Sequence, residues 1–270
     1  MQLAKKHDTE IISADSRQVY TELNIGVARP AIADLETIKH HCIGHISINN
    51  AYNTGDFVRD CNENLKTIFL KKNVAIICGG TGLYIKALLY GLDYFPDVDE
   101  NVRSELNLIF KNEGIDILQK MLKEKDEVYY NIVDLQNPHR LIRALEVCNS
   151  SNKPYSYFLN RKKQHFPYSF ENYVLNIPKE KLHHNIEVRV EKMIEQGLEN
   201  EVKTLLPYKH LQALQTVGYK EIFDYLENKL TLSSAIELIK IHTKQYAKRQ
   251  LTWLRKQENT IWIENTKEIM

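Results

Sequence analysis

The chain has 270 residues, of which 43% are apolar and 26% charged, as is typical of a globular protein. Its net charge of +1 excludes a nucleic-acid affinity based on overall charge, so any such affinity must come from local patches. No apolar run reaches the roughly 18–20 residues of a membrane span, and the N-terminus resembles no signal peptide. We therefore expect a cytoplasmic protein with no membrane partner. The cysteines are spaced as reduced thiols rather than as a disulfide framework: Cys42, Cys61, Cys78 and Cys148.

Two stretches in the first third of the chain predict parallel strands. The sequence EIISADS (residues 10–16) predicts a short strand that ends at Asp15, preceded by the end of a helix. The sequence NVAIICGG (residues 73–80) predicts a second strand, and its continuous apolar run is expected when both faces of a parallel sheet are covered. A glycine turn, GGTG, and a helix follow it. This is the order of a phosphate-binding loop, but the pattern G-x-x-x-x-G-K-[ST] is absent from the sequence.

Helix signals replace strand signals between residues 97 and 160. Acidic residues before a stop at Gly114 predict one helix, and the cap Asn137 with Pro138 at the first helical position predicts another. The predicted domains are an α/β core over residues 1–98 and 160–270 and a helical insertion over residues 99–159. The core is expected to end in a strand over residues 173–179 and helical segments over residues 180–196, 199–206 and 231–256.

Asp15 is the first candidate for chemistry, because ligands of open α/β sheets bind at the carboxyl ends of strands. A carboxylate at that place can accept a proton from a bound nucleophile. It can equally cap the turn that follows it, as Asp and Ser often do. Its position alone favours neither interpretation.

The last helical segment carries six lysine or arginine residues and no acid between Lys240 and Lys256. At helical spacing one side of it presents Lys240, Lys244, Lys248 and Arg255. A run of charge is more often a solvated amphipathic face, but the lack of acidic partners favours an anion site such as an RNA backbone.

Arginine residues also mark the insertion. Arg140 and Arg143 project from one helix face with no acid at that spacing, which suits a phosphate backbone about as well as salt bridges to other helices. Aromatic residues surround Arg161, Lys162 and Lys163, a pattern that also fits RNA, although a tyrosine-rich loop packed on its own domain is the stronger interpretation. The cluster HHCIGH (residues 40–45) lacks the second ligand pair of a structural zinc site.

Several stretches together resemble one family. They are EIISADSRQVY, IGVARP, HHCIGHISINNAYNTGDF, GGTGLYIKALLYGL, NPHRLIRALEV, VGYKEIFDYLENKL and TKQYAKRQLTWLRK, and in this order they are similar to the motifs of the bacterial tRNA dimethylallyltransferase (tRNA isopentenyltransferase) family. The resemblance covers nearly the whole chain. It implies an α/β fold with a P-loop NTPase-like parallel sheet core, a helical insertion domain that contacts tRNA, and C-terminal helices.

The resemblance also implies a reaction and its substrates. A dimethylallyl group moves from dimethylallyl diphosphate to N6 of adenosine 37, beside the anticodon of tRNAs that read codons beginning with U. The base must leave the loop stack to be reached. The implied partners are the anticodon stem-loop of tRNA and dimethylallyl diphosphate, the implied cofactor is Mg²⁺, and we expect a monomer.

Residue by residue, the resemblance assigns candidate roles. Asp15 matches the general base, and Lys244, where the family has the arginine of T-R-Q, keeps the positive charge but loses the bidentate fork. His139 stands where the family has glutamine. The positions implied to contact tRNA are Asp15, Ser16, Arg17, Gln18, Thr81, Arg103, His139, Arg140, Arg143 and Lys248. The glycines of the GGTG turn are expected to let the backbone come close to RNA.

The family's phosphate loop, G-P-T-x-x-G-K-[ST], is expected ahead of the sequence MQLAKK and is not among the 270 residues. That loop would supply the hydroxyl that binds Mg²⁺, so no metal ligand is identified in the chain. We accordingly expect little transferase activity from these residues alone, with tRNA affinity retained. The alternatives are a non-catalytic tRNA-binding protein derived from the same family and a small-molecule kinase of P-loop type.

Overall fold

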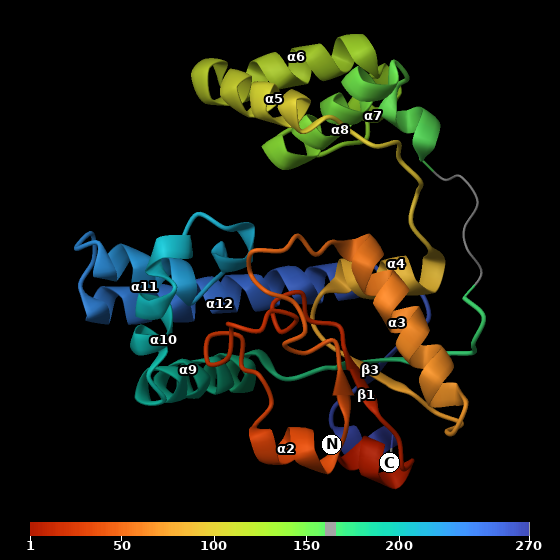
Figure 1. Cartoon of the computed structure of the whole chain (residues 1–270), viewed down its shortest axis with the longest axis vertical. Coiled ribbons are helices and arrows are strands. Elements are labelled where there is room, and N and C mark those ends of the chain that lie inside the picture. Colours follow the sequence, from red (N-terminus) through yellow and green to blue (C-terminus); the bar gives the residue numbers. More distant parts are fainter. Residues whose placement is uncertain (160–165, 270) are drawn as a thin grey trace. The chain divides into compact units, whose positions relative to one another are not determined.

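The structure is a computed structural model that describes residues 1–159 and 166–269 (Figure 1). It divides into two compact units, each described here by itself. The first, which we call the core unit, consists of Met1–Leu89 and Phe166–Met270, and the second, the helical unit, is Tyr90–His165. The assignment of residues 99–159 as a separate tRNA-contacting domain stays a prediction. The predicted basic segment with Arg161, Lys162 and Lys163 lies outside the described residues.

A three-stranded parallel sheet forms the centre of the core unit. Its strands are β1 (Ile11–Ser13), β2 (His40–His41) and β3 (Ile76–Cys78), in the order β2-β1-β3. The predicted strands at residues 10–16 and 73–80 are therefore confirmed. Coverage of both faces of β3 is not, because its residues are half-buried or exposed, whereas all three residues of β1 are buried. β3 stands at the end of the strand order, where fewer side chains can pack against it.

Short helices surround this sheet: α1 (Gln2–Lys6), α2 (Ile32–Thr37), α3 (Thr54–Phe69) and α4 (Gly82–Tyr90). α3 begins at a capping box, in which the Asn53 side chain accepts from the backbone N–H of Asp56 and the Asp56 carboxylate accepts from the backbone N–H of Asn53. Ile12 of β1 packs against α3 and α4, where the rings of Phe57 and Tyr84 stack with centroids 4.3 Å apart. This packing fixes the loops at the carboxyl ends of β1 and β3.

A larger apolar cluster joins the C-terminal helices to the segment after β1. The helices are α9 (Lys179–Glu195), α10 (Leu198–Thr204), α11 (Tyr219–Leu226) and α12 (Leu232–Leu254), with short 3-10 turns at Leu206–Tyr208 and Gln212–Leu214. The three predicted helical segments are confirmed within two residues at each end. α11 was not predicted as a helix. The buried Glu221 side chain accepts from the backbone N–H of Gly218 at its start, a local cap that the predicted pattern did not use.

A second, two-stranded parallel sheet pairs β4 (Asn172–Leu175) with β5 (Thr260–Ile263). The predicted strand at residues 173–179 is shorter than expected, since α9 already begins at residue 179 after Pro178. β5 was missed, because its partner lies 88 residues away in sequence and no local signal indicates it. A last 3-10 turn, Thr266–Ile269, follows.

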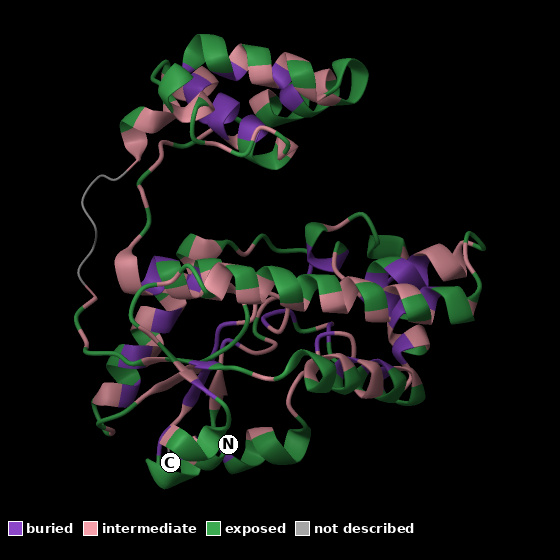
Figure 2. Cartoon of the chain, turned by 180° about the vertical axis from the view of Figure 1, so that it is seen from behind, coloured by how far each residue is buried: buried purple, intermediate pink, exposed green. Residues whose placement is uncertain are grey.

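The helical unit consists of α5 (Glu100–Glu113), α6 (Ile115–Lys125), α7 (Glu127–Tyr130) and α8 (Pro138–Ser151), followed by a 3-10 turn at Tyr155–Phe158. The predicted stop at Gly114 is confirmed by its φ of +82°, and the Asn137 side chain caps α8 ahead of Pro138. The apolar side chains Leu141, Ala144 and Leu145 of α8 are buried against α5 and α6, and Figure 2 shows the helices of this unit with buried and exposed faces. Within residues 1–159 and 166–269, no helix is long and apolar enough to cross a membrane.

Candidate functional site

Asp15 lies two residues after the end of β1 at Ser13, at the carboxyl end of the strand. One carboxylate oxygen, Oδ1, accepts from the backbone N–H groups of Arg17 (2.8 Å) and Gln18 (3.3 Å). The capping role considered from the sequence is therefore confirmed for Oδ1. The second oxygen, Oδ2, takes part in neither bond, so the same side chain can hold the loop and accept a proton from a ligand.

The side chains of Arg17 and Gln18 fasten this loop to other parts of the core unit. Arg17 Nη1 donates to the carbonyl oxygens of Gln212 (3.1 Å) and Ala213 (3.3 Å). Gln18 Nε2 donates to the carbonyls of residues 27 and 28, and its Oε1 accepts from the Ser13 hydroxyl at 3.0 Å. Their contact with tRNA stays a prediction, and in this structure both side chains hold the loop in place.

The GGTG turn after β3 meets the Asp15 loop. Thr81 donates its backbone N–H to the Ala14 carbonyl (3.1 Å), and its hydroxyl oxygen accepts from the Ser16 N–H (3.0 Å). Thr81 and Ser16 therefore join the loops that follow β3 and β1. A direct contact between Thr81 and tRNA stays a prediction.

The glycines of this turn are required by contacts within the protein. A Cβ added at Gly79 would overlap the Ala14 backbone, and one at Gly80 would overlap the Gln250 amide, whose Nε2 donates to the Gly80 carbonyl at 2.9 Å. At Gly82 it would lie 2.6 Å from the Trp253 ring. These contacts give the glycines a structural role, because α12 and the β1 loop occupy the space that a side chain would need. A close approach of this backbone to RNA stays a prediction.

Two side chains not predicted from the sequence lie within electrostatic reach of Asp15. Partial burial and the Asp15 carboxylate raise the pKa of Tyr246 on α12. On α9, desolvation lowers the pKa of the Arg189 guanidinium, and the Asp15 carboxylate acts in the opposite direction. Tyr246, Gln250 and Trp253 stand at helical spacing and therefore share one face of α12. That face lies along the loops that follow β1 and β3. The spacing is visible in the sequence.

A cavity of about 440 Å³ opens between residues 25–29 and α9. Its lining includes the cationic side chains of Arg29, Arg189 and Lys192, together with His184. Apolar side chains such as Val188 and Met193 complete it. The cavity therefore combines positive charge with an apolar wall.

The basic stripe of α12 has acidic partners, contrary to expectation. Lys240 Nζ lies 3.3 Å from Glu191 and 3.0 Å from Glu237, and Lys244 Nζ lies 2.6 Å from Glu187 Oε1. The bond from Lys244 lowers the pKa of Glu187. Glu187 and Glu191 belong to α9, so a search along α12 alone could not find them. Lys240 fits neither a solvated face nor an anion site, because its side chain is only 16% exposed and is paired with two glutamates. The catalytic role of Lys244 stays a prediction.

Lys248 differs from these two lysines, because it is exposed and makes no ion pair with any residue that the structure describes. In the helical unit, His139 and Arg140 are exposed on the first turn of α8. The expectation that Arg143 lacks an acidic neighbour is wrong, since its Nη1 lies 3.4 Å from Glu146 Oε2. Arg103 on α5 contacts the same carboxylate.

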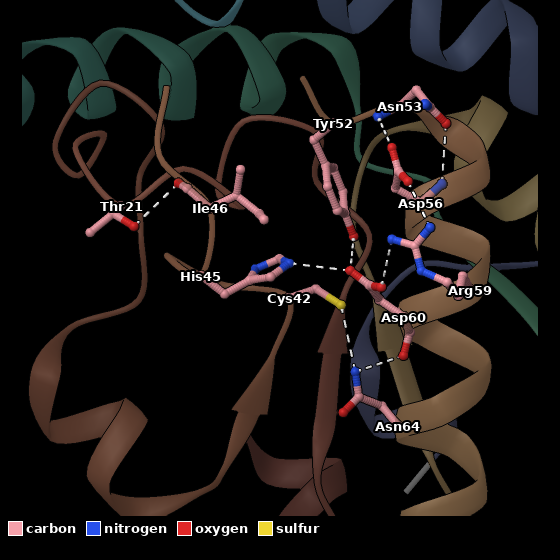
Figure 3. A network of polar contacts seen from close by, with 10 residues as sticks. All are labelled: Thr21, Cys42, His45, Ile46, Tyr52, Asn53, Asp56, Arg59, Asp60 and Asn64. Atoms are coloured by element: carbon pink, nitrogen blue, oxygen red, sulfur yellow. Dashed lines mark hydrogen bonds and ion pairs between the residues drawn. The ribbon is translucent and has the colours of Figure 1, made fainter. Parts of the chain in front are cut away.

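The histidine-rich segment is a structural network rather than a metal site. His41 contacts Glu10, whereas His45 Nε2 lies 3.5 Å from Asp60 on α3, whose Oδ2 also accepts from the Tyr52 hydroxyl at 2.9 Å (Figure 3). Burial raises the pKa of Cys42 to about 12, and the thiol lies beside Asn64. All four cysteines are unpaired thiols, as predicted.

Mg²⁺ was the cofactor implied by the resemblance. No group of three or more His, Cys, Asp or Glu side chains with metal-binding geometry exists among the described residues. Near Asp15 the hydroxyls of Ser13 and Thr81 are already bonded to protein groups. These residues do not fit a resident metal site.

The sequence matches the family model described as IPP transferase over residues 18–257. A tRNA dimethylallyltransferase of Christiangramia forsetii is 47% identical, in an alignment that covers 100% of this chain and 90% of that protein. The tRNA dimethylallyltransferase of Cytophaga hutchinsonii is 41% identical, with 97% and 86% covered.

Solved structures agree with these matches. The full-length tRNA isopentenylpyrophosphate transferase of Bacillus halodurans aligns with a TM-score of 0.69 at 31% identity, over 97% of this chain and 83% of that one. A eukaryotic dimethylallyltransferase, described as acting on tRNA, aligns with a TM-score of 0.76 at 26% identity, over 94% of this chain and 65% of that one. The predicted fold class, an α/β protein with a small parallel sheet, is confirmed by these neighbours.

Proposed function

Because the chain belongs to the IPP transferase family, we propose that it is a tRNA prenyltransferase that moves a dimethylallyl group from dimethylallyl diphosphate to N6 of adenosine 37. Its tRNAs are those that read codons beginning with U. The observation that carries the proposal is Asp15 at the carboxyl end of β1, with Oδ1 held by backbone N–H groups and Oδ2 outside those bonds. A general base requires such a fixed carboxylate with one oxygen available.

The proposed transfer is a single displacement. N6 of the adenine forms a bond to the allylic carbon while the bond from that carbon to the diphosphate oxygen breaks, and the electron pair leaves with the diphosphate. The N6 proton passes to Asp15 Oδ2. Since the adenine must reach Asp15, it has to leave the stack of the anticodon loop.

Positive charge near Asp15 supports the departure of the diphosphate. Arg189 lies within electrostatic reach of Asp15 and lines the cavity that also contains Arg29 and Lys192. Cations fixed where negative charge develops stabilise the transition state. The apolar part of the cavity wall suits the hydrocarbon portion of the donor.

The tRNA is proposed to bind through its anticodon stem-loop. Exposed cationic side chains for its backbone are Arg103 and Arg140 on the helical unit and Lys248 on α12. Ser16 and Thr81 are proposed to contact RNA at the ends of β1 and β3, beside the base. Backbone contacts of this kind make the affinity depend on salt.

Three further features belong to the proposal. Mg²⁺ is proposed to accompany the donor diphosphate, since this ion prefers phosphate oxygens and water to a site made by protein alone. The protein is proposed to act as a monomer. It is proposed to work in the cytoplasm, as its reduced cysteines fit.

Nucleoside mass spectrometry tests the proposal. tRNA is incubated with an excess of the protein, dimethylallyl diphosphate and Mg²⁺ over hours, so that even slow transfer is detected. We expect the dimethylallyl group on adenosine 37 and none on a tRNA in which guanosine replaces that base. If the protein binds tRNA but leaves it unmodified even when the phosphate-loop segment of a relative is fused ahead of Met1, the non-catalytic alternative is correct.

A further inference from the structure

Glu146 on α8 lies at the centre of a three-residue ion cluster in the helical unit. Its side chain is only 1% exposed. Oε1 lies 2.7 Å from Arg103 Nε and Oε2 accepts from Arg103 Nη2 at 2.9 Å, which makes the contact bidentate. Arg143 Nη1 lies 3.4 Å from the same Oε2. One buried carboxylate therefore joins arginines from α5 and α8 that stand 40 positions apart.

The two guanidinium groups differ from the carboxylate in their exposure. The side chains of Arg103 and Arg143 are 56% and 36% exposed. The bidentate contact uses Nε and Nη2 of Arg103 and leaves its Nη1 donors directed elsewhere. The cluster keeps one net positive charge, so an anion can still be bound from the solvent side.

Aromatic rings support Arg143 in addition to Glu146. Its guanidinium carbon lies 5.5 Å from the centroid of the Phe95 ring, within cation–π distance. Phe95 in turn stacks on Tyr155 with ring centroids 4.7 Å apart, and the ring centroids of Tyr155 and Tyr129 lie 4.5 Å apart. Arg143 is thereby fixed by a carboxylate and by an aromatic ring, which reduces the rotamer freedom that a long side chain loses on binding.

We propose that Glu146 is a positioning residue that joins Arg103 and Arg143 into one clamp for the phosphate groups of an RNA backbone. The inference rests on the proposed function only in taking tRNA as the ligand. Arginine suits this role because its planar fork binds phosphate oxygens bidentately. Glu146 itself contacts no RNA. It acts by holding the guanidinium groups of Arg103 and Arg143 in fixed positions relative to each other.

The competing role for Glu146 is that of a simple counter-charge, and the two roles predict opposite results. The substitution Glu146→Gln preserves shape and removes one negative charge. A counter-charge predicts tighter RNA binding, because the patch gains net positive charge. A positioning role predicts weaker RNA binding, because the guanidinium groups of Arg103 and Arg143 lose their fixed orientation.

The test measures the affinity of the full chain for an anticodon stem-loop RNA across a series of salt concentrations. For Glu146→Gln we expect affinity to fall about tenfold and the salt slope to fall by about 1, with the transfer rate at saturating RNA unchanged. The matched control is Glu105→Gln, which removes one exposed acid from α5 and should bind slightly more tightly than wild type. Equal or tighter binding by Glu146→Gln would overturn the proposal, as would a loss confined to the transfer rate.

A second variant keeps the test decisive if Glu146→Gln folds poorly. Arg103→Lys retains the charge at an exposed position but cannot make the bidentate contact. We expect it to weaken RNA binding as Glu146→Gln does, and the double variant to bind no more weakly than either single one. Additive losses would show that the residues act independently and would contradict the clamp. If wild type itself does not bind tRNA, the proposed function fails instead.

Discussion

Asp15 and Glu146 are both carboxylates at the centre of a candidate site, but backbone N–H groups hold Asp15 and arginine side chains hold Glu146. The partners of Asp15 are two and three residues away, whereas Arg103 is 43 residues from Glu146. The first arrangement orients one oxygen and leaves the other for chemistry. The second uses both oxygens to orient other side chains. A carboxylate held by its own loop suits proton transfer, and one held by arginine side chains from two helices suits the binding of a large anion.

Removal of the charge of Asp15 should have the largest effect. In Asp15→Asn the amide oxygen can still accept from the Arg17 N–H, so the loop should keep its conformation. We expect the transfer rate constant to fall by about 10²–10⁴-fold, while RNA affinity changes by less than about twofold. Single-turnover kinetics measure the first quantity and filter binding the second.

The control for this variant is Asp34→Asn, at an exposed position on α2, which should transfer at the wild-type rate. A rate for Asp15→Asn within about fivefold of wild type would exclude a general-base role.

Substitution of two glycines in the GGTG turn tests how far the Asp15 loop depends on close backbone contact with this turn. Gly79→Ala would place a methyl group against the Ala14 backbone, which cannot move without disturbing β1. Overpacking of this kind should lower the free energy of unfolding by about 1–3 kcal/mol. Gly80→Ala meets only the flexible Gln250 amide and should cost less. Chemical denaturation of both variants measures the difference, and an equal cost would contradict this reading of the turn.

Tyr219 provides an intermediate case, in which a side chain supports a loop at a distance. Its hydroxyl donates to Glu201 Oε1 at 2.6 Å, and Glu201 also accepts from the backbone N–H groups of Ile25 and Gly26. Tyr219→Phe should lower the free energy of unfolding by about 1 kcal/mol. Thermal unfolding measures it, with Tyr208→Phe, at an exposed position, as the control.

The pH dependence of this effect follows from the same contact. Burial, followed by the nearby Glu201 carboxylate, raises the pKa of Tyr219 above that of an unfolded tyrosine, about 10. The contribution is therefore fully present below about pH 10 and is lost as the pH rises further. A stability difference between Tyr219→Phe and wild type that already disappeared near pH 8 would contradict it.

The smallest effect is expected at the half-exposed ion pair between Lys244 and Glu187. The bond from Lys244 lowers the pKa of Glu187, so the pair stabilises the fold above about pH 4 and this contribution is lost as the pH falls further. Lys244→Met should lower Tm by less than about 2 °C at neutral pH, because solvent screens such pairs. Differential scanning calorimetry at neutral and acidic pH checks both statements, and a large loss of transfer activity in this variant would instead support a catalytic role for Lys244.

The sequence predicts the features that depend on near neighbours. The strand before Asp15, the Asp15 cap, and the start of α8 at Asn137 and Pro138 are all local patterns, and all are found in the structure, although the strand ends at Ser13 rather than at Asp15. Contacts between distant segments could not be predicted in this way. Lys244 has no acidic partner nearby in sequence because Glu187 belongs to α9, and the contact of Gly82 with Trp253 joins residues 171 positions apart in the chain.

Arg189 and Glu146 show the same limit at the candidate sites. Neither carries a local signal that separates it from other charged residues on an amphipathic helix. Each becomes a candidate only when the fold brings it to Asp15 or to Arg103. The spacing of Tyr246, Gln250 and Trp253 is the one signal on α12 that identifies a face directed at the loops.

The most direct test compares Asp15→Asn and Glu146→Gln in one experiment, in which single-turnover transfer is measured at increasing concentrations of protein with trace tRNA. The curves separate the maximal transfer rate from the protein concentration that gives half of it. Our account predicts that Asp15→Asn lowers only the maximal rate and that Glu146→Gln raises only the half-saturating concentration. If both substitutions change the same parameter, the division between a carboxylate that acts in proton transfer and one that positions RNA-binding arginines is wrong.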